Sequence, residues 1–270
     1  MASIFNKAFR DSKRTMIWLS IGLGLYILMM MSIYPSLMEQ ADEISDLMES
    51  YPEGIMRMFY SGDISEFNIV DPGIFLQTYV GTWGLLILGA IVIVQAFNAF
   101  TNAERDGTMD MTLSLPVSRR DLLVGRALNT AVTMLVVLAV CAVTVIVCAQ
   151  IWPEFETDMV RVTIALLAGI FPLMVVAGFT YLLAVWVPSS RRFAGPIAYL
   201  FFFGSYLIYG LVGTVESLHW VQPLLLFDYY DIGGIINHGV DITNWLIMAA
   251  AAAVYFGLAW WLVDRKELGV

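Results

Sequence analysis

Long apolar segments alternate with short polar ones along most of this chain. A helix needs about 20 apolar residues to cross a hydrocarbon core roughly 30 Å thick, and six runs reach about that length with at most one charge each. They cover residues 16–34, 74–100, 122–151, 160–187, 193–215 and 245–263, with a long outer loop at 35–73. The pattern predicts an all-α polytopic membrane protein with six transmembrane helices in a single domain over residues 1–270.

The distribution of charge orients these six predicted spans. An even number of spans places both termini on one side, and 12 of the 14 Lys and Arg residues fall on that side, whereas only Arg57 and Arg161 fall on the other. Positive charge is retained on the cytoplasmic side of membrane proteins. We therefore expect cytoplasmic termini and a multi-pass protein in the plasma membrane of a prokaryote. Acidic residues gather on the outer side, where they indicate a solvated surface or an attraction for cationic substrates.

The residues before the first span have two interpretations. Apolar and basic side chains separate onto two helical faces: Ile4, Phe5, Ala8 and Phe9 on one, Lys7, Arg10 and Arg14 on the other. This is typical of an amphipathic elbow helix that lies in the cytoplasmic interface and leads into the first span. The alternative is a plain basic flank that only sets the topology.

The spans carry little chemistry of their own. None has an Asp, Glu, His or Lys at mid-depth, and both histidines, His219 and His238, fall in outer loops. Ion-coupled carriers and intramembrane hydrolases need such groups, so we expect no catalytic, metal or cofactor-binding residue and no enzyme activity in this chain. The mild polar residues in the spans are candidates for a substrate pathway or for hydrogen bonds between helices. They include Gln95, Asn98, Asn129, Thr133 and Ser205.

A polar interruption between the second and third spans has a more specific pattern. Thr108 is placed to cap a short helix that has Met109 and Leu113 on one face, and Pro116 prevents that helix from continuing. The sequence from Ser118 to Asp121 fits the capping pattern [ST]-x-x-[DE], so the third span should begin at about Ser118. The pattern predicts a short cytoplasmic helix, a tight proline turn and a membrane span, which together form a rigid element.

The same residues carry a resemblance to a known family. Glu104, Gly107-Thr108, the run from Leu113 to Arg120 and Gly125-Arg126 closely resemble the signature of ABC exporter permeases of the type 2 family, apart from Thr112, where leucine is more usual. The resemblance implies a coupling helix at about residues 102–115 that docks on a nucleotide-binding subunit. The implied contact residues are Glu104, Arg105, Asp106, Gly107, Thr108, Met109 and Leu113, and the turn and start of the third span comprise Pro116, Ser118, Arg119 and Arg120.

The resemblance also implies partners. The chain has no G-x-x-x-x-G-K-[ST] motif, since none of its three lysines follows a glycine, so ATP and Mg²⁺ should be bound by a separate ATPase subunit in two copies. A second permease protomer, identical or similar, would complete the complex in membrane lipid, with no role for nucleic acid. The expected activity is export of a substrate such as a drug, lipid or other amphipath.

Two further points stay open at this stage. The outer segment 216–241 resembles the short re-entrant helices before the sixth span of related exporters, but an ordinary loop resting on the interface has a similar composition. The function has two alternatives: an ATPase-linked membrane complex used in signalling or maturation, and a stand-alone channel or secondary carrier.

Overall fold

The computed structural model describes residues 2–41, 43–44, 51, 68, 70–105, 118–186, 193–212 and 215–263. Regular structure in these ranges is helical throughout, and six of the helices are long and apolar enough to cross a membrane. They are Asn6–Glu39, Pro72–Asn98, Arg119–Ile151, Met159–Trp186, Ala194–Val212 and Ile242–Val263. This confirms the predicted all-helical, six-span architecture.

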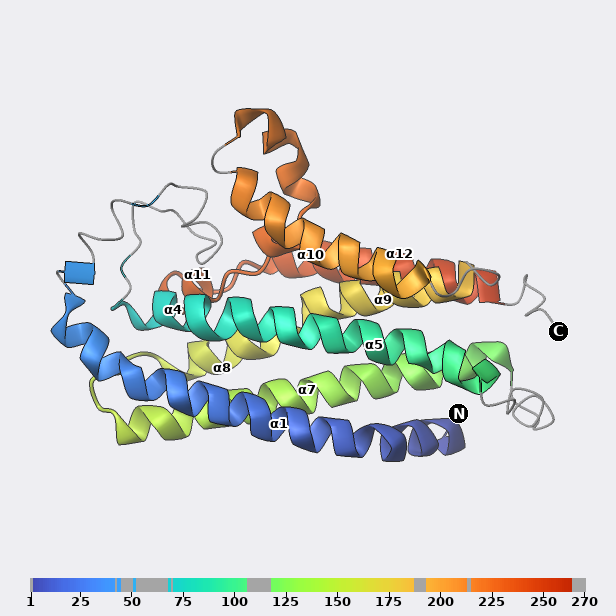
Figure 1. Ribbon diagram of the computed structural model, residues 1–270, viewed down its shortest axis with the longest axis horizontal. Helices are drawn as coiled ribbons and strands as arrows, with labels where there is room; N and C mark the ends of the chain where they lie inside the picture. Colours follow the sequence, from blue (N-terminus) through green and yellow to red (C-terminus); the bar gives the residue numbers. More distant parts are fainter. Residues whose placement is uncertain are drawn as a thin grey trace.

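The elements follow the chain in a simple order. They are α1 (Ala2–Glu39), α4 (Pro72–Phe75), η2 (Leu76–Thr82), α5 (Trp83–Arg105), α7 (Arg119–Ile151), α8 (Met159–Ala168), α9 (Ile170–Trp186), α10 (Ala194–Val212), η4 (Glu216–Leu224), η5 (Leu226–Asp228), α11 (Ile232–Asn237) and α12 (Ile242–Val263). The long helices lie along the long axis of the molecule (Figure 1). Helix α1 packs along α7, α12 packs along α9, and α5 contacts both α9 and α10.

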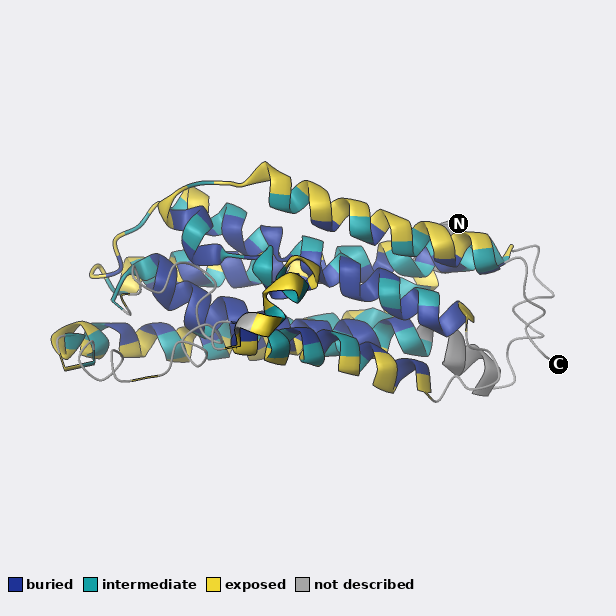
Figure 2. Cartoon of the chain, turned by 90° about the horizontal axis from the view of Figure 1, so that it is seen from above, coloured by how far each residue is buried: buried dark blue, intermediate teal, exposed yellow. Residues whose placement is uncertain are grey.

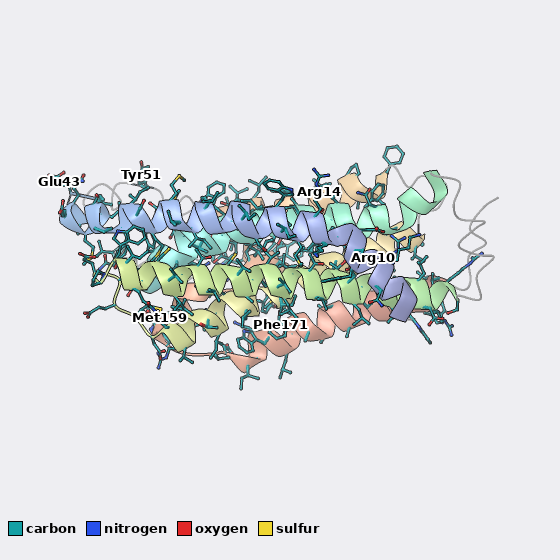
Figure 3. All side chains as sticks on the ribbon, turned by 90° about the horizontal axis from the view of Figure 1, so that it is seen from below. Arg10, Arg14, Glu43, Tyr51, Met159 and Phe171 are labelled. Atoms are coloured by element: carbon teal, nitrogen blue, oxygen red, sulfur yellow. The ribbon has the colours of Figure 1, made fainter. Side chains whose placement is uncertain are left out.

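The two ends of this bundle are distinct. Helix α1 begins, α5 ends, α7 begins and α12 ends at one end, which we call the inner end following the charge rule (Figure 1). Helices α4 and α11 lie at the opposite, outer end. Figure 3 shows Arg10 and Arg14 in the inner part of α1, and Glu43 near the outer end. The basic residues of α1 thus all lie in its inner part, where Asp11 also lies, and Glu39 ends the helix on the outer side.

The surface of the bundle is apolar. Buried residues fill the centre and exposed ones follow the outward sides of the long helices (Figure 2). Large apolar side chains are among the exposed ones, including Trp18, Leu200 and Leu246. In water such a surface would aggregate, whereas lipid tails solvate it. The described helices therefore have the surface of a membrane protein.

The first span differs from the prediction in its extent. Helix α1 continues without interruption from Ala2 to Glu39, so the predicted elbow and the first span form one helix. Its ribbon bends near Arg10 (Figure 3). Pro35 lies inside its last turns without ending it. The placement of the first turns in the membrane interface stays a prediction, and most of the predicted outer loop after Ile44 lies outside the described residues.

The fourth span, predicted as one helix over 160–187, is broken at Gly169. Pro172 has no N–H to donate to the carbonyl of Ala168, four residues earlier, so the α-helical bonding cannot continue through this turn. Gly169 instead donates to carbonyls three and two residues earlier, in a tight turn between α8 and α9. The proline is tolerated because it lies in the first turn of α9.

Near its start the second span contains a π-helical segment, η2, that the periodicity did not predict. Its seven residues follow the single turn of α4, which starts at Pro72 with Asp71 as N-cap. The hydroxyl of Thr82 donates to the carbonyl of Gln77, 3.1 Å away. Wider turns of this kind often occur at functional sites. Here the Gln77 side chain is buried against the outer segment.

Candidate functional site

The predicted docking segment lies only partly within the described residues. Glu104 and Arg105 form the last turn of α5, and their side chains are outside the described part. The remaining predicted contacts, Asp106, Gly107, Thr108, Met109 and Leu113, together with Pro116 of the turn, fall in 106–117, outside the described residues. Their roles stay predictions. The described residues that flank this segment are the end of α5 and the start of α7.

Helix α7 begins where the capping pattern predicts. The backbone of Ser118 is extended and its hydroxyl oxygen accepts a hydrogen bond from the N–H of Asp121, 3.1 Å away. The same hydroxyl donates to the Asp121 carboxylate at 2.8 Å, and the Ser118 carbonyl accepts from Leu122. This cap fixes the first helical residue, so the segment before it joins a helix with a defined start.

A contact that the sequence did not predict joins this start to the last turn of α12. The guanidinium carbon of Arg120 lies 3.9 Å from the centre of the Trp260 ring. Cation–π contacts of this kind stabilise by about 0.5–2 kcal/mol, depending on exposure. The sequence indicated only that Arg120 lies on the cytoplasmic side at the start of the third span, and its pairing with Trp260 depends on how the two helices pack.

Two hydrogen bonds tie the next turns of α7 to other helices. Asn129, a predicted pathway residue, donates from Nδ2 to the Ser12 hydroxyl of α1 at 2.8 Å. One residue later, the hydroxyls of Thr130 and Tyr181 of α9 lie 3.1 Å apart. The inner half of α7 therefore contacts α1, α9 and α12 through specific polar or cationic groups, and these contacts connect the four helices at the inner end.

The other predicted pathway residues are distributed over three helices. Ser205 of α10 is buried and its hydroxyl accepts a hydrogen bond from the N–H of Leu226, 3.0 Å away, so it holds the outer segment. Thr133 of α7 is fully buried, and its hydroxyl has no hydrogen-bond partner within the described chain. Neither amide atom of Gln95 in α5 has one either. Asn98 is half-buried in the last turns of α5.

The outer end holds a compact cluster around α11, and the outer segment, for which the sequence left short helices and an ordinary loop open, forms the short helices η4, η5 and α11. Asp231 caps the start of α11 by accepting from the N–H of Gly234 at 2.9 Å, and the Gln77 side-chain oxygen accepts from the N–H of Ile232. Burial raises the pKa of the Asp231 carboxyl, while the Gly234 hydrogen bond and the charge of His238 oppose that shift. Two of the N–H groups at this helix start, those of Ile232 and Gly234, are thereby satisfied.

Arg161 satisfies the other end of α11. Its Nη1 donates to the carbonyls of Ile236 at 3.0 Å and Asn237 at 3.2 Å, and its Nε lies 3.5 Å from the Asp158 carboxylate. The sequence indicated only that Arg161 lies on the outer side of the membrane. In the fold it is a C-terminal cap for a helix 75 residues away along the chain.

The break in the fourth span completes this cluster. Because Gly169 donates to Leu166, the carbonyl of Ala165 loses its usual intrahelical partner. The hydroxyl of Tyr230, just before α11, donates to that carbonyl at 3.3 Å. A Cβ on Gly169 would lie 2.9 Å from the same hydroxyl. The glycine thus permits the close approach, and the tyrosine satisfies the carbonyl that the break leaves free.

Close packing holds α11 against the second span as well. A Cβ built on Gly81 would lie 2.6 Å from Ile232 Cδ1, and one on Gly73 would lie 2.9 Å from Asn237 Oδ1. Asn237 also donates to Asp71 at 3.0 Å, and Asp71 caps α4. The start of the second span, the fourth span and α11 therefore form one interlocked outer cluster.

The comparison with protein families identifies the chain. A model described as ABC-2 family transporter protein matches residues 2–268, nearly the whole chain. The comparison with curated proteins found no match. The family match agrees with six membrane-spanning helices and with the polar segment between the second and third of them. The chain therefore belongs to the ABC-2 family of transporter proteins and is the permease subunit of an ABC transporter.

Proposed function

We propose that this permease works in an ATP-driven exporter and that residues 102–115 dock on a separate ATPase subunit. Two copies of that subunit would bind ATP and Mg²⁺, and each would engage one of two permease protomers, identical or similar. The substrate class is an amphipath such as a drug or a lipid. We further propose a prokaryotic plasma membrane, with cytoplasmic termini as the charge distribution favours.

The observation that supports this proposal best is the anchoring of α7 directly after the proposed docking segment. Ser118 fixes the helix start, Arg120 contacts α12 through Trp260, and Asn129 contacts α1 through Ser12. A force applied to residues 102–115 would therefore reach three spans within a few turns. A docking surface without such contacts would move only its own loop.

We propose that the outer cluster resists this motion at the other end of the spans. Helix α11 is bonded to the second span through Gln77 and to the fourth through Arg161. We propose that these contacts keep the outer end closed until displacement of the spans strains them. Gln95, Asn98, Asn129, Thr133 and Ser205 remain proposed pathway residues, and among them Gln95 and Thr133 have polar atoms without partners in the described chain.

The test is co-purification with the ATPase encoded beside the permease, followed by reconstituted transport. Glu104→Lys should reduce both ATPase association and ATP-dependent transport, because it reverses a charge at the edge of the docking segment. Glu154→Lys is the matched control, since Glu154 is exposed near the outer end. It should leave both unchanged.

Three results would contradict the proposal. Normal ATPase association and transport in the Glu104 variant would remove the docking assignment. Substrate flux without ATP would favour a channel or carrier. An associated ATPase whose activity drives processing or signalling, with no substrate transported, would favour the alternative ATPase-linked complex.

A further inference from the structure

A groove opens on the side of the bundle near the inner end, between α7, α9 and α12. Its volume is about 410 Å³, which lies in the range of roughly 300–1,000 Å³ common for small-molecule sites. The described residues that line it are apolar without exception, and they include Leu123, Ala127 and Ala131 of α7, Met174 of α9, and Phe256 and Trp260 of α12. A polar ligand would gain nothing from these walls.

The groove runs along the helices and matches one lipid leaflet in depth. Leu123 and Ala131 are eight residues apart on α7, so they span about 12 Å along the helix axis. One leaflet contributes half of a hydrocarbon core roughly 30 Å thick, about 15 Å. The groove therefore has the length to hold the first part of an acyl chain lying parallel to the spans.

One end of the groove is cationic. Trp260 lines the groove, and the guanidinium of Arg120 lies 3.9 Å from the centre of its ring. Arg119 precedes it in the first turn of α7, while the nearby carboxylate of Asp121 accepts a hydrogen bond from Ser118. An anionic group at the membrane surface would meet the Arg120 guanidinium at this end of the apolar groove, with Arg119 next to it along the chain.

We propose that this groove binds an anionic phospholipid of the inner leaflet, with an acyl chain between α7 and α12 and its phosphate at Arg119 and Arg120. The wall chemistry selects the tail and the arginines select the headgroup. The inference depends on the orientation set by the charge rule. It requires neither an ATPase partner nor export, so it can succeed or fail separately from the proposed function.

A second copy of the chain fits this groove less well. Two protomers related by a two-fold axis along the membrane normal present the same patch to each other, so that each residue faces its own copy or a near neighbour. A contact through this groove would place Arg119 and Arg120 of one protomer near those of the other. A phospholipid brings the opposite charge to the same position.

Gly257 offers a direct way to fill the groove. It lines the groove on α12, and a Cβ built there meets no atom within 4 Å. Gly257→Leu should therefore place its side chain in the space of the acyl chain without disturbing the fold. Gly22→Leu is the matched control, because Gly22 is exposed on α1, lies outside the groove and also has open space around its Cβ.

The experiment measures lipid retention by native mass spectrometry on delipidated permease given phosphatidylglycerol or phosphatidylcholine. The wild type should retain phosphatidylglycerol preferentially. Gly257→Leu should weaken that binding about tenfold or more, because its side chain occupies the space of the acyl chain and removes part of the apolar contact between lipid and groove. Gly22→Leu should not change the binding. Arg119→Gln should weaken it about fivefold, as expected for one basic residue near an anionic membrane surface, without changing phosphatidylcholine retention.

Several results would overturn the proposal. Equal retention of the two lipids by the wild type would mean that only non-specific lipid occupies the groove. Equal effects of Gly257→Leu and Gly22→Leu would place the bound lipid elsewhere. Efficient disulfide cross-linking between Gly257→Cys protomers would identify a second copy as the occupant. The comparison of the two leucine variants is made on folded protein, which their unchanged melting temperatures verify.

Discussion

The outer and inner halves of this permease treat their buried polar groups differently. At the outer end, the buried side chains of Gln77 and Tyr230 each bond to a named backbone group, and Thr78 is the exception among the described residues. In the inner half, both amide atoms of Gln95 and the hydroxyl of Thr133 are buried without a hydrogen-bond partner in the described chain. A buried polar side chain therefore makes its hydrogen bond in the outer half, whereas in the inner half several such side chains do not.

This contrast suggests which half is built for stability. A buried polar group that makes its hydrogen bond is roughly neutral or modestly stabilising, whereas one without a partner costs about 1–3 kcal/mol. Native proteins retain such costs mainly where another role requires the group. The outer cluster has the features of a fixed closure, and the inner half has those of a region adapted to ligand contact or movement.

The largest expected effect comes from replacing the bonded glutamine. Gln77→Leu removes the acceptor for the buried N–H of Ile232 at the start of α11. We expect it to lower the free energy of unfolding by about 1–3 kcal/mol, measured by denaturation in detergent micelles.

The identical substitution at Gln95 serves as its control. Gln95→Leu should leave stability unchanged or raise it, because the amide makes no hydrogen bond in the described chain. If Gln95 contacts substrate, transport by this variant should fall while stability does not. Equal destabilisation by the two substitutions would remove the contrast between the halves.

Tyr230→Phe should have the next largest effect. It removes the hydroxyl that satisfies the Ala165 carbonyl at the break in the fourth span. Hydrogen bonds between membrane helices contribute about 0.6 kcal/mol on average and up to about 1.7. We expect a loss near the upper value, read from thermal unfolding. Tyr255→Phe on α12, where the ring contacts Phe179, should cause almost no change.

Removing the cap of α7 tests the inner end. Ser118→Ala deletes the side-chain acceptor for the Asp121 N–H, which typically costs about 1 kcal/mol. We expect fraying to be local and visible as faster amide hydrogen exchange in the first turn of α7. Ser118→Asp, which retains an acceptor, should restore protection. Protection that is unchanged in Ser118→Ala would mean that packing alone holds this start.

The smallest expected effect concerns the contact between α7 and α12. Trp260→Leu should lower the unfolding free energy by about 0.5–1 kcal/mol beyond the effect of the matched surface change Trp18→Leu. In a double-mutant cycle this difference should vanish when Arg120 is already Gln. A difference that persists would show that Trp260 stabilises by apolar packing and not through the Arg120 guanidinium.

The family and topology were accessible from sequence because they depend on local patterns. Span lengths and the pattern from Ser118 to Asp121 each lie within one segment, and the bias of Lys and Arg is a count over the segments between spans, so none of them requires knowing which helices pack together. The family signature between residues 104 and 126 is local as well. These features predicted six spans, the start of α7 and membership of the ABC-2 family.

Other features depended on partners far away along the chain. The bond between Gln77 and Ile232 joins residues 155 apart, and Arg161 caps a helix 75 residues later. Polar side chains in spans have similar local surroundings, so sequence alone does not separate Gln77, which is bonded, from Gln95, which is not. Only packing brings an acceptor to a free N–H.

The sequence by itself determined the solvent of this protein, its number of spans, their expected orientation and its family, because hydropathy and short motifs act over a few helical turns. The tertiary structure decided which hydroxyl satisfies the carbonyl left free by the break in the fourth span, which groups close the outer end, and that Arg120 lies against an apolar groove. Each of these depends on a backbone or side-chain group supplied by a separate helix, and that proximity exists only once the spans have packed.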